Sequence, residues 1–227
     1  MCGRYSFVPT KKQLDEQLQD VELPAVMQLS FNIAPTHQAY VITGDQPALL
    51  QQMTWGLVPY WSHDGANKGK LINARAEGIL EKPSFRVPAL RRHCLVPADS
   101  FYEWRTLPGK RKVPYRIRPR DSRLFFMAGI WDEWRIGDER RRTFSIITTT
   151  PNADIAPLHN RMPVIFSTPD QQQRWLQSTD PEEITALLHA PPDGMLELYR
   201  VSEKLNAPGQ DDPSLHDPVD EENPTLF

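Results

Sequence analysis

The stretch PADSFYEWRTLPGKRKVPYRIR, residues 97–118, indicates how this chain folds. Its centre, residues 106–112, is a polar loop around Pro108-Gly109, with strand-like sequence on both sides. In the second of these segments, Val113–Arg118, apolar and arginine side chains alternate, which is typical of a strand with one buried face. Two strands joined by a short turn pair in antiparallel fashion. The stretch therefore predicts a β-hairpin and, with it, antiparallel sheet.

Further strands and a few short helices are predicted outside this hairpin. The strand-like segments are Val41–Thr43, Pro47–Gln51, Leu124–Trp131, Thr143–Thr150, Val164–Phe166 and Leu196–Val201. Helix start signals occur at Thr10, where Gln13 completes a capping box, at Thr168-Pro169 and at Asp180-Pro181. The 22 prolines disfavour long helices. The pattern favours an α+β fold in one domain over a doubly wound α/β fold.

Composition narrows the class of protein. The 227 residues, 39% hydrophobic and 24% charged, contain no apolar run long enough for a membrane helix. The first residues lack the apolar core of a signal peptide, and the two cysteines are too few for a disulfide scaffold. We therefore expect a cytoplasmic protein without membrane contact. Collagens, coiled coils, secreted mini-proteins and membrane channels are excluded.

Charge is distributed unevenly, although the net charge is only −3. Residues 105–142 carry 12 basic and 5 acidic side chains, net +7, whereas residues 143–227 carry 4 basic and 14 acidic ones, net −10. A local basic patch can attract an anion whatever the total charge. The acidic end predicts a disordered tail, residues 217–227, after a domain of residues 1–216.

Cys2 is the most unusual residue for its position. Removal of the initiator Met1 would leave Cys2 with both a free α-amine and a thiol on one residue. An α-amine has a pKa of about 7.7–8.0, so part of it is neutral at pH 7. A neutral amine attacks an aldehyde to form a Schiff base, and the thiol can then close a five-membered thiazolidine. The alternative is an idle thiol in a terminal tail.

Three further segments carry side chains that can assist such a reaction. If Asn73-Ala74-Arg75 is extended, its amide and guanidinium share a face, although a turn with a solvated arginine is the common alternative. Glu103 lies among three aromatic residues, and burial there would raise the pKa of its carboxyl, whereas a position facing water would not. His159 suits acid–base chemistry at neutral pH, although most single histidines are not catalytic.

Other residues are candidate contacts for a nucleic acid. Tyr60 and Trp61 precede a polar stretch, so at least one ring is a candidate for stacking on an unpaired base, although rings more often belong to the core. Arg4 suits an anionic substrate or is a plain surface charge. The cysteines and histidines lack the spacing of a metal site, and there is no phosphate-binding glycine loop. We predict neither a metal nor a cofactor.

Seven short motifs occur in order along residues 2–206. They are Met1–Arg4, Phe31–Pro35, Trp55–Pro59, Ile72–Glu77, Pro97–Trp104, Leu158–Pro163 and Val201-Ser202. Together these motifs resemble the SOS response-associated peptidase (SRAP) family. The resemblance implies a barrel-like fold of twisted, mainly antiparallel sheet with flanking short helices. It also implies covalent capture of abasic sites in single-stranded DNA, as part of a DNA damage response, through the N-terminal cysteine.

The resemblance implies a role for each matching residue. Cys2 looks like the nucleophile, Glu103 the proton-transfer group, His159 the residue that helps open the deoxyribose, and Asn73 the positioning amide. Arg4, Arg75 and Arg161 look like phosphate contacts, and Pro35, Tyr60 and Trp61 lie where the family wedges or stacks against bases. Gly3, which lets a ligand approach the backbone, and the hydroxyl of Thr149 complete the candidate DNA contacts. The expected protein is a monomer, associated with the nucleoid in a bacterium.

Two other classes of function remain open at this stage. An N-terminal Cys beside Asn, Glu and His is also the equipment of a cysteine-type peptidase, or of an N-terminal nucleophile hydrolase that removes its own Met1. Lyase-type chemistry at the captured site is a further possibility. A plain nucleic-acid-binding module would need only the basic segment at residues 105–142.

Overall fold

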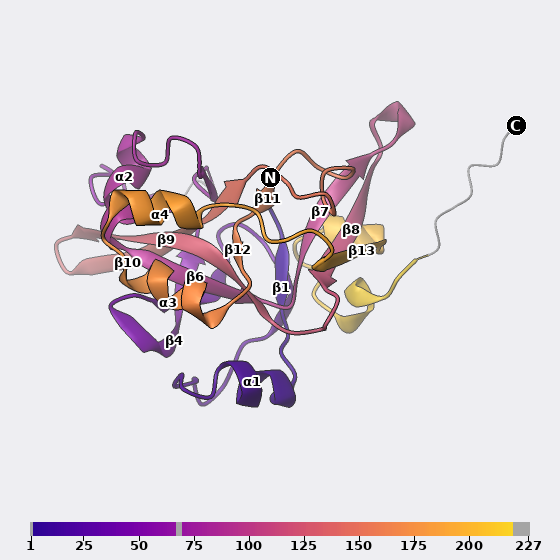
Figure 1. Cartoon of the computed structure of the whole chain (residues 1–227), viewed down its shortest axis with the longest axis horizontal. Helices are drawn as coiled ribbons and strands as arrows, with labels where there is room; N and C mark the ends of the chain where they lie inside the picture. The colour runs from indigo at the N-terminus through magenta and orange to yellow at the C-terminus, as the bar shows by residue number, and fades with distance from the viewer. Residues whose placement is uncertain (1, 67–69, 220–227) are drawn as a thin grey trace, which may run out of the picture.

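The strands of this protein form two sheets. The computed structural model describes residues 2–66 and 70–219 (Figure 1). The smaller sheet is antiparallel, with strands in the order β13 (Leu196–Arg200), β8 (Lys112–Pro119), β7 (Ser100–Thr106), β1 (Tyr5–Phe7) and β2 (Ser30–Ile33). The hairpin predicted around residues 106–112 is confirmed as β7 and β8, and its tip projects from the molecule at the upper right of Figure 1.

The larger sheet closes on itself. Its strands are, in order, β11 (Met162–Pro163), β10 (Glu139–Thr149), β4 (Gln46–Trp55), β3 (Gln38–Thr43), β6 (His93–Ala98), β9 (Phe125–Ile136) and β12 (Ile165–Phe166), and β5 (Asn73–Arg75) pairs with β10. Because β9 also pairs with β10, the strands β10, β4, β3, β6 and β9 form a closed ring. β10 pairs in parallel with β4 and β5, and the other pairings are antiparallel. The barrel-like, mainly antiparallel fold is thereby confirmed.

Short helices flank the sheets. They are α1 (Lys11–Gln17), α2 (Pro83–Arg91), α3 (Pro169–Gln177) and α4 (Pro181–Leu187), with 3₁₀ turns η1 (Pro108–Lys110), η2 (Glu203–Asn206) and η3 (Pro213–His216). The predicted starts of α1, α3 and α4 are confirmed, since Thr10, Thr168 and Asp180 each cap a helix with their side chains. The sequence analysis missed α2, because Lys82 provides no side-chain cap and Pro88 lies inside the helix.

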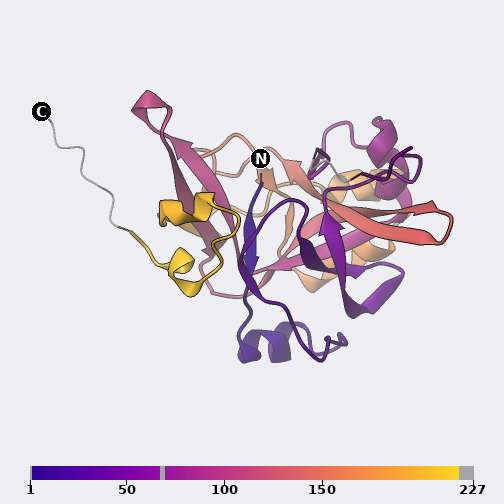
Figure 2. The same cartoon turned by 180° about the vertical axis from the view of Figure 1, so that it is seen from behind.

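The start of the chain is buried in the middle of the fold. β1 lies between β7 and β2 in the smaller sheet, and this indigo strand is seen in the middle of the molecule in Figures 1 and 2. Tyr5 and Phe7 are each only 1% exposed, and the Tyr5 ring meets Trp55 edge to face at 5.2 Å. Burial of these rings holds β1 in place, so the residues just before it are also drawn into the interior.

A buried ion pair stabilises the smaller sheet. The Arg116 guanidinium donates to Asp99 Oδ2 at 2.9 Å, and both side chains are only 9% exposed. Replacing Asp99 by Ala leaves the Arg116 charge buried without its partner. We expect this variant to lose about 3–5 kcal/mol of unfolding free energy, measured by urea denaturation. The exposed pair Asp170–Arg174 is the control, and Asp170→Ala should leave the urea midpoint almost unchanged. Equal effects of the two variants would contradict a structural role for the buried pair.

The C-terminal segment, residues 202–219, packs back onto the smaller sheet. Pro218 pairs with Val201, and the Val219 amide donates to the Arg200 carbonyl. Of the predicted tail, residues 217–219 belong to this paired segment, and residues 220–227 lie outside the described residues. Among the helices that the structure describes, none is long and apolar enough to cross a membrane.

Candidate active site

Cys2 lies fully buried just before β1, and its backbone is held in place. The Asn73 side chain donates from Nδ2 to the Cys2 carbonyl oxygen at 2.7 Å. Two residues on, the Arg4 carbonyl accepts a hydrogen bond from the Tyr102 amide at 2.9 Å. Burial raises the pKa of the Cys2 thiol, and the negative charge of Glu103 raises it further. The sulfur is therefore a protonated thiol at neutral pH.

Glu103 projects from β7 into the same interior. Its side chain is only 3% exposed, as expected from its aromatic neighbours in the sequence. Burial raises the pKa of the carboxyl, although the imidazole of His159, with Nε2 3.8 Å from Oε2, acts in the opposite direction. A carboxyl with a raised pKa is suited to accept and return a proton near neutrality.

His159 sits in the loop between β10 and β11. Its Nδ1 lies 3.0 Å from the Arg161 amide nitrogen and 3.1 Å from the Arg161 carbonyl oxygen. Nδ1 can accept from the amide, or carry a proton and donate to the carbonyl. The loop thus holds the ring in either tautomer, while Nε2 faces Glu103. This arrangement lets the ring gain or lose a proton without leaving its position.

Asn73 is positioned by the parallel pairing of β5 with β10. The pairs Ile146 with Asn73 and Thr148 with Arg75 fix the register. Ala74 is fully buried between them, so Asn73 and Arg75 share the opposite face. The expected alternation is confirmed: the amide reaches the Cys2 backbone, and the guanidinium of Arg75 is exposed.

The other two candidate arginines make contacts within the protein. Arg161 binds both carboxylate oxygens of Glu77, at 2.9 and 2.8 Å, and donates to the Thr148 carbonyl at 2.6 Å. Arg4 donates from one terminal nitrogen to Asn32 Oδ1 at 2.6 Å and to the Leu205 carbonyl at 2.7 Å. Both guanidiniums are therefore anchored before any ligand arrives.

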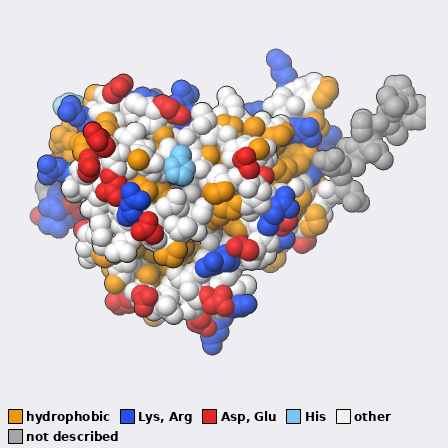
Figure 3. All heavy atoms as spheres, viewed as in Figure 1, with side chains coloured by type: hydrophobic (Ala, Val, Ile, Leu, Met, Phe, Trp, Pro, Cys, Tyr) orange, Lys and Arg blue, Asp and Glu red, His pale blue; other side chains and the backbone are white. Residues whose placement is uncertain are grey.

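An open groove of about 630 Å³ leads to Glu103 and His159. It is lined by Arg4, Glu103, Trp104, Lys110, Arg111, Lys112, His159, Glu203 and Asn206. Three basic residues come from the tip of the β7–β8 hairpin, where Lys and Arg side chains are visible at the upper right of Figure 3. The groove offers a basic approach to a buried site, which suits an anionic chain as ligand.

Exposed aromatic residues lie on a loop that the barrel supports. Tyr60 and Trp61 are 53% and 52% exposed, so both rings are accessible for stacking. The Tyr60 amide donates to Asp132 at 2.9 Å, and Trp134 Nε1 donates to the Ser62 carbonyl at 2.7 Å. Two side chains of β9 therefore hold the loop in place. Among the remaining candidates, Gly3 and Pro35 are half-buried and Thr149 is 5% exposed.

Comparison with known proteins assigns the chain to a family. The model of the family described as SOS response associated peptidase (SRAP) matches residues 1–208. The chain belongs to the SRAP family. The resemblance inferred from the seven motifs is thereby confirmed.

Relatives of this SRAP protein match most of its length. The abasic site processing protein YoqW of Bacillus subtilis is 39% identical over 95% of this chain and 98% of its own length. The abasic site processing protein HMCES of Gallus gallus is 32% identical over 76% of this chain and 58% of its own length. A crystal structure of a protein from Bacteroides thetaiotaomicron, 29% identical, superposes with a TM-score of 0.84 over 96% of this chain and 100% of that chain.

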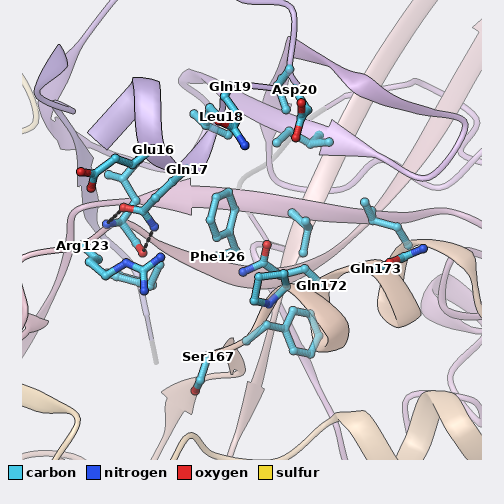
Figure 4. Close-up of a pocket in the computed structure, with 18 of the residues that line it drawn as sticks. Glu16, Gln17, Leu18, Gln19, Asp20, Arg123, Phe126, Ser167, Gln172 and Gln173 are labelled. Atoms are coloured by element: carbon cyan, nitrogen blue, oxygen red, sulfur yellow. Dashed lines mark hydrogen bonds between the residues drawn. The ribbon is translucent and has the colours of Figure 1, made fainter. Parts of the chain in front are cut away.

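A second cavity of about 610 Å³ lies elsewhere in the SRAP domain. Figure 4 shows it between α1 and α3, with Phe126 of β9 at its floor and glutamine side chains around it. None of the candidate site residues lines this cavity. The described residues contain no cluster of His, Cys, Asp and Glu that could hold a metal ion.

The sequence analysis did not predict the role of three side chains that support the SRAP site. Asn32 anchors Arg4, Glu77 anchors Arg161, and Asp132 supports the Tyr60 loop. Asn32 and Glu77 lie inside two of the seven motifs, Phe31–Pro35 and Ile72–Glu77, and membership of a motif was the only sign of their role. Asp132 lies in the middle of β9 and gave no local signal, because its partner is 72 residues away.

Proposed function

We propose that this protein captures abasic sites in single-stranded DNA as a covalent adduct on Cys2. The relatives described above are named abasic site processing proteins. The observation that carries the proposal is the convergence of Asn73 and Glu103 on the residue that becomes the N-terminus when Met1 is removed. An N-terminal cysteine has the amine and thiol that trap an aldehyde, and an abasic site is an aldehyde in its open form.

The first chemical step forms an imine. Hydrolysis of the Met1–Cys2 peptide bond consumes one water and frees the α-amine. The amine attacks the aldehyde carbon, the carbonyl oxygen takes up a proton, and loss of one water leaves the imine. Glu103 accepts the proton that the nitrogen gives up and returns it to the departing hydroxyl. His159 moves the proton that opens the deoxyribose ring to its aldehyde.

The second step closes the ring. The thiol adds to the imine carbon and its proton passes to the nitrogen through Glu103, so a thiazolidine forms without any change of oxidation state. The raised thiol pKa fits this order, since a protonated thiol does not compete with the amine for the aldehyde. Asn73 holds the Cys2 carbonyl, which restrains the backbone of the reacting residue near Glu103.

The surroundings of the site favour an unpaired strand. The basic residues of the groove suit the phosphates, and the exposed rings of Tyr60 and Trp61 offer stacking surfaces for bases. The aldehyde carbon of the abasic site must reach the buried Cys2. In an unpaired strand this requires less free energy, because the nucleotide is already unstacked.

The test mixes the protein with single-stranded DNA that contains one abasic site. A band that survives a denaturing gel, with an intact mass equal to the protein without Met1 plus the DNA minus one water, is the expected result. DNA with a reduced abasic site, which has no aldehyde, is the matched control. Absence of the band in protein shown to lack Met1 would overturn the proposal and favour the peptidase alternative, which peptide substrates then test.

Arg75 provides a separate test of the DNA path. Its exposed guanidinium should contribute one phosphate contact, so Arg75→Ala is expected to weaken binding of the reduced abasic strand. The slope of log K against log salt should become shallower by about 1, so the loss is larger at low salt than at high salt. Fluorescence anisotropy over a salt series measures this. An unchanged slope would remove Arg75 from the interface.

A further inference from the structure

Asn32 connects the two ends of the described chain beside the site. It lies on β2, is 1% exposed and uses both ends of its amide. Oδ1 accepts from Arg4 at 2.6 Å. Nδ2 lies within hydrogen-bond distance of three carbonyls in the C-terminal segment, those of Leu205 (3.4 Å), Ala207 (3.2 Å) and Gln210 (2.7 Å).

Arg4 receives support from the same two sides. Besides Asn32, it donates to the Leu205 carbonyl at 2.7 Å, and its guanidinium lies 6.0 Å from the centre of the Trp104 ring. Trp104 is itself tied to the C-terminal segment, because its Nε1 donates to Asn206 at 2.7 Å. Arg4 thus sits in a socket built from β2, β7 and residues 205–210.

This socket holds Arg4, which is two residues from the nucleophile Cys2. β1 begins only at Tyr5, so Cys2 lies outside the strand, and its position depends on side-chain contacts as well as on the backbone hydrogen bond from Tyr102 to Arg4. Asn73 holds one of these points, the Cys2 carbonyl. The Arg4 socket holds the chain on the other side of Gly3, a residue with no side chain of its own to pack.

We propose that Asn32 is a positioning residue for capture of the abasic site, acting through Arg4 on Cys2. The inference rests on the function proposed above. The amide is suited to this task because the acceptor holds the guanidinium while the donor holds main-chain carbonyls, and no charged side chain offers both. Loss of this link lets the first residues move relative to Glu103, and misplacement of a nucleophile slows a reaction without weakening the binding of its substrate.

The experiment compares three variants. Asn32→Ala removes both halves of the link. Asn32→Asp keeps an acceptor for Arg4 and loses the donor. Asp212→Ala removes the side-chain cap of η3, elsewhere in the C-terminal segment, and is the control for general loosening of that segment. Each variant is tested for the crosslinking rate constant at saturating protein and for the affinity for the reduced abasic strand.

Asn32→Ala is expected to lower the rate constant at least about tenfold while the affinity changes less than about twofold. Asn32→Asp keeps the contact with Arg4 but loses the donor to the C-terminal carbonyls, so its rate should lie between those of Asn32→Ala and wild type. Asp212→Ala should retain the wild-type rate at a lower melting temperature. A wild-type rate in Asn32→Ala, or an equal loss in Asp212→Ala, would overturn the inference. If Asn32→Ala does not fold, Arg4→Met replaces it, since it removes the nitrogen that donates to both Asn32 and the Leu205 carbonyl, and a wild-type rate in that variant would equally overturn the inference.

A second readout does not depend on the DNA reaction. Cys2 and Cys94 are both fully buried, so alkylation followed by peptide mass mapping reports on each separately. Asn32→Ala should speed alkylation of Cys2 about tenfold and leave Cys94 protected. If the wild-type protein forms no crosslink but Asn32→Ala speeds Cys2 labelling, the proposed function is rejected while the positioning of Cys2 by Asn32 stands. A normal wild-type crosslink with unchanged Cys2 labelling in Asn32→Ala would do the reverse.

Discussion

We expect Cys2→Ala to abolish the covalent adduct with abasic single-stranded DNA. Non-covalent binding should stay within about twofold of wild type. The substitution removes the thiol that closes the ring, so any imine that forms remains open to hydrolysis. The adduct is measured on a denaturing gel, and binding is measured by anisotropy with the reduced abasic strand.

The chain offers a matched control for this result. Cys94 is also fully buried, and its pKa is likewise raised by burial, but it lies on β6 within the barrel. Cys94→Ala should therefore retain the adduct. Cys2→Ser keeps the amine without the thiol, so it should form an adduct only when borohydride reduces the imine. A stable adduct in Cys2→Ala would mean that another group attacks the lesion.

Glu103→Gln has the second-largest expected effect. It removes the group that moves protons during imine formation, and we expect crosslinking to slow by about 10²-fold. Wild-type crosslinking should rise with pH as Glu103 loses its proton, with a midpoint above the ordinary range of a glutamate because burial raises the pKa of this carboxyl. That limb of the pH–rate profile should disappear in Glu103→Gln.

Thermal stability separates this role from a structural one. A buried carboxylate is costly to desolvate, and a glutamine of similar shape is neutral. The melting temperature of Glu103→Gln should therefore equal or exceed that of wild type at neutral pH. A marked fall in melting temperature, together with an unchanged pH–rate profile, would make Glu103 a packing residue.

Much of the fold could be predicted from local sequence. The β7–β8 hairpin and the starts of α1, α3 and α4 depend on short-range signals, namely a turn between alternating strands and side chains that cap a helix. β6 was not predicted, since HCLVPA is a fully buried run without alternation. Closure of the barrel was not derivable from spacing, because the parallel pairing of β10 with β4 joins residues far apart in sequence.

The candidate site was also predictable only in part. The motifs named the side chains that the fold brings together, and the clearest cases are Asn73 on the Cys2 carbonyl and His159 beside Glu103. The internal partners of Arg4 and Arg161 were beyond reach, because they lie 28, 201 and 84 residues away along the chain. An arginine beside a nucleophile looks the same in sequence whether it faces a ligand or a carbonyl.

The socket around Arg4 also bears on when the protein becomes reactive during its synthesis. Arg4 is synthesised well before the Leu205 carbonyl, because the two residues are 201 positions apart along the chain. Such distant contacts form late in folding. A nascent chain therefore carries its cysteine for most of translation without a finished pocket, and the site is assembled only once nearly all of the domain has emerged.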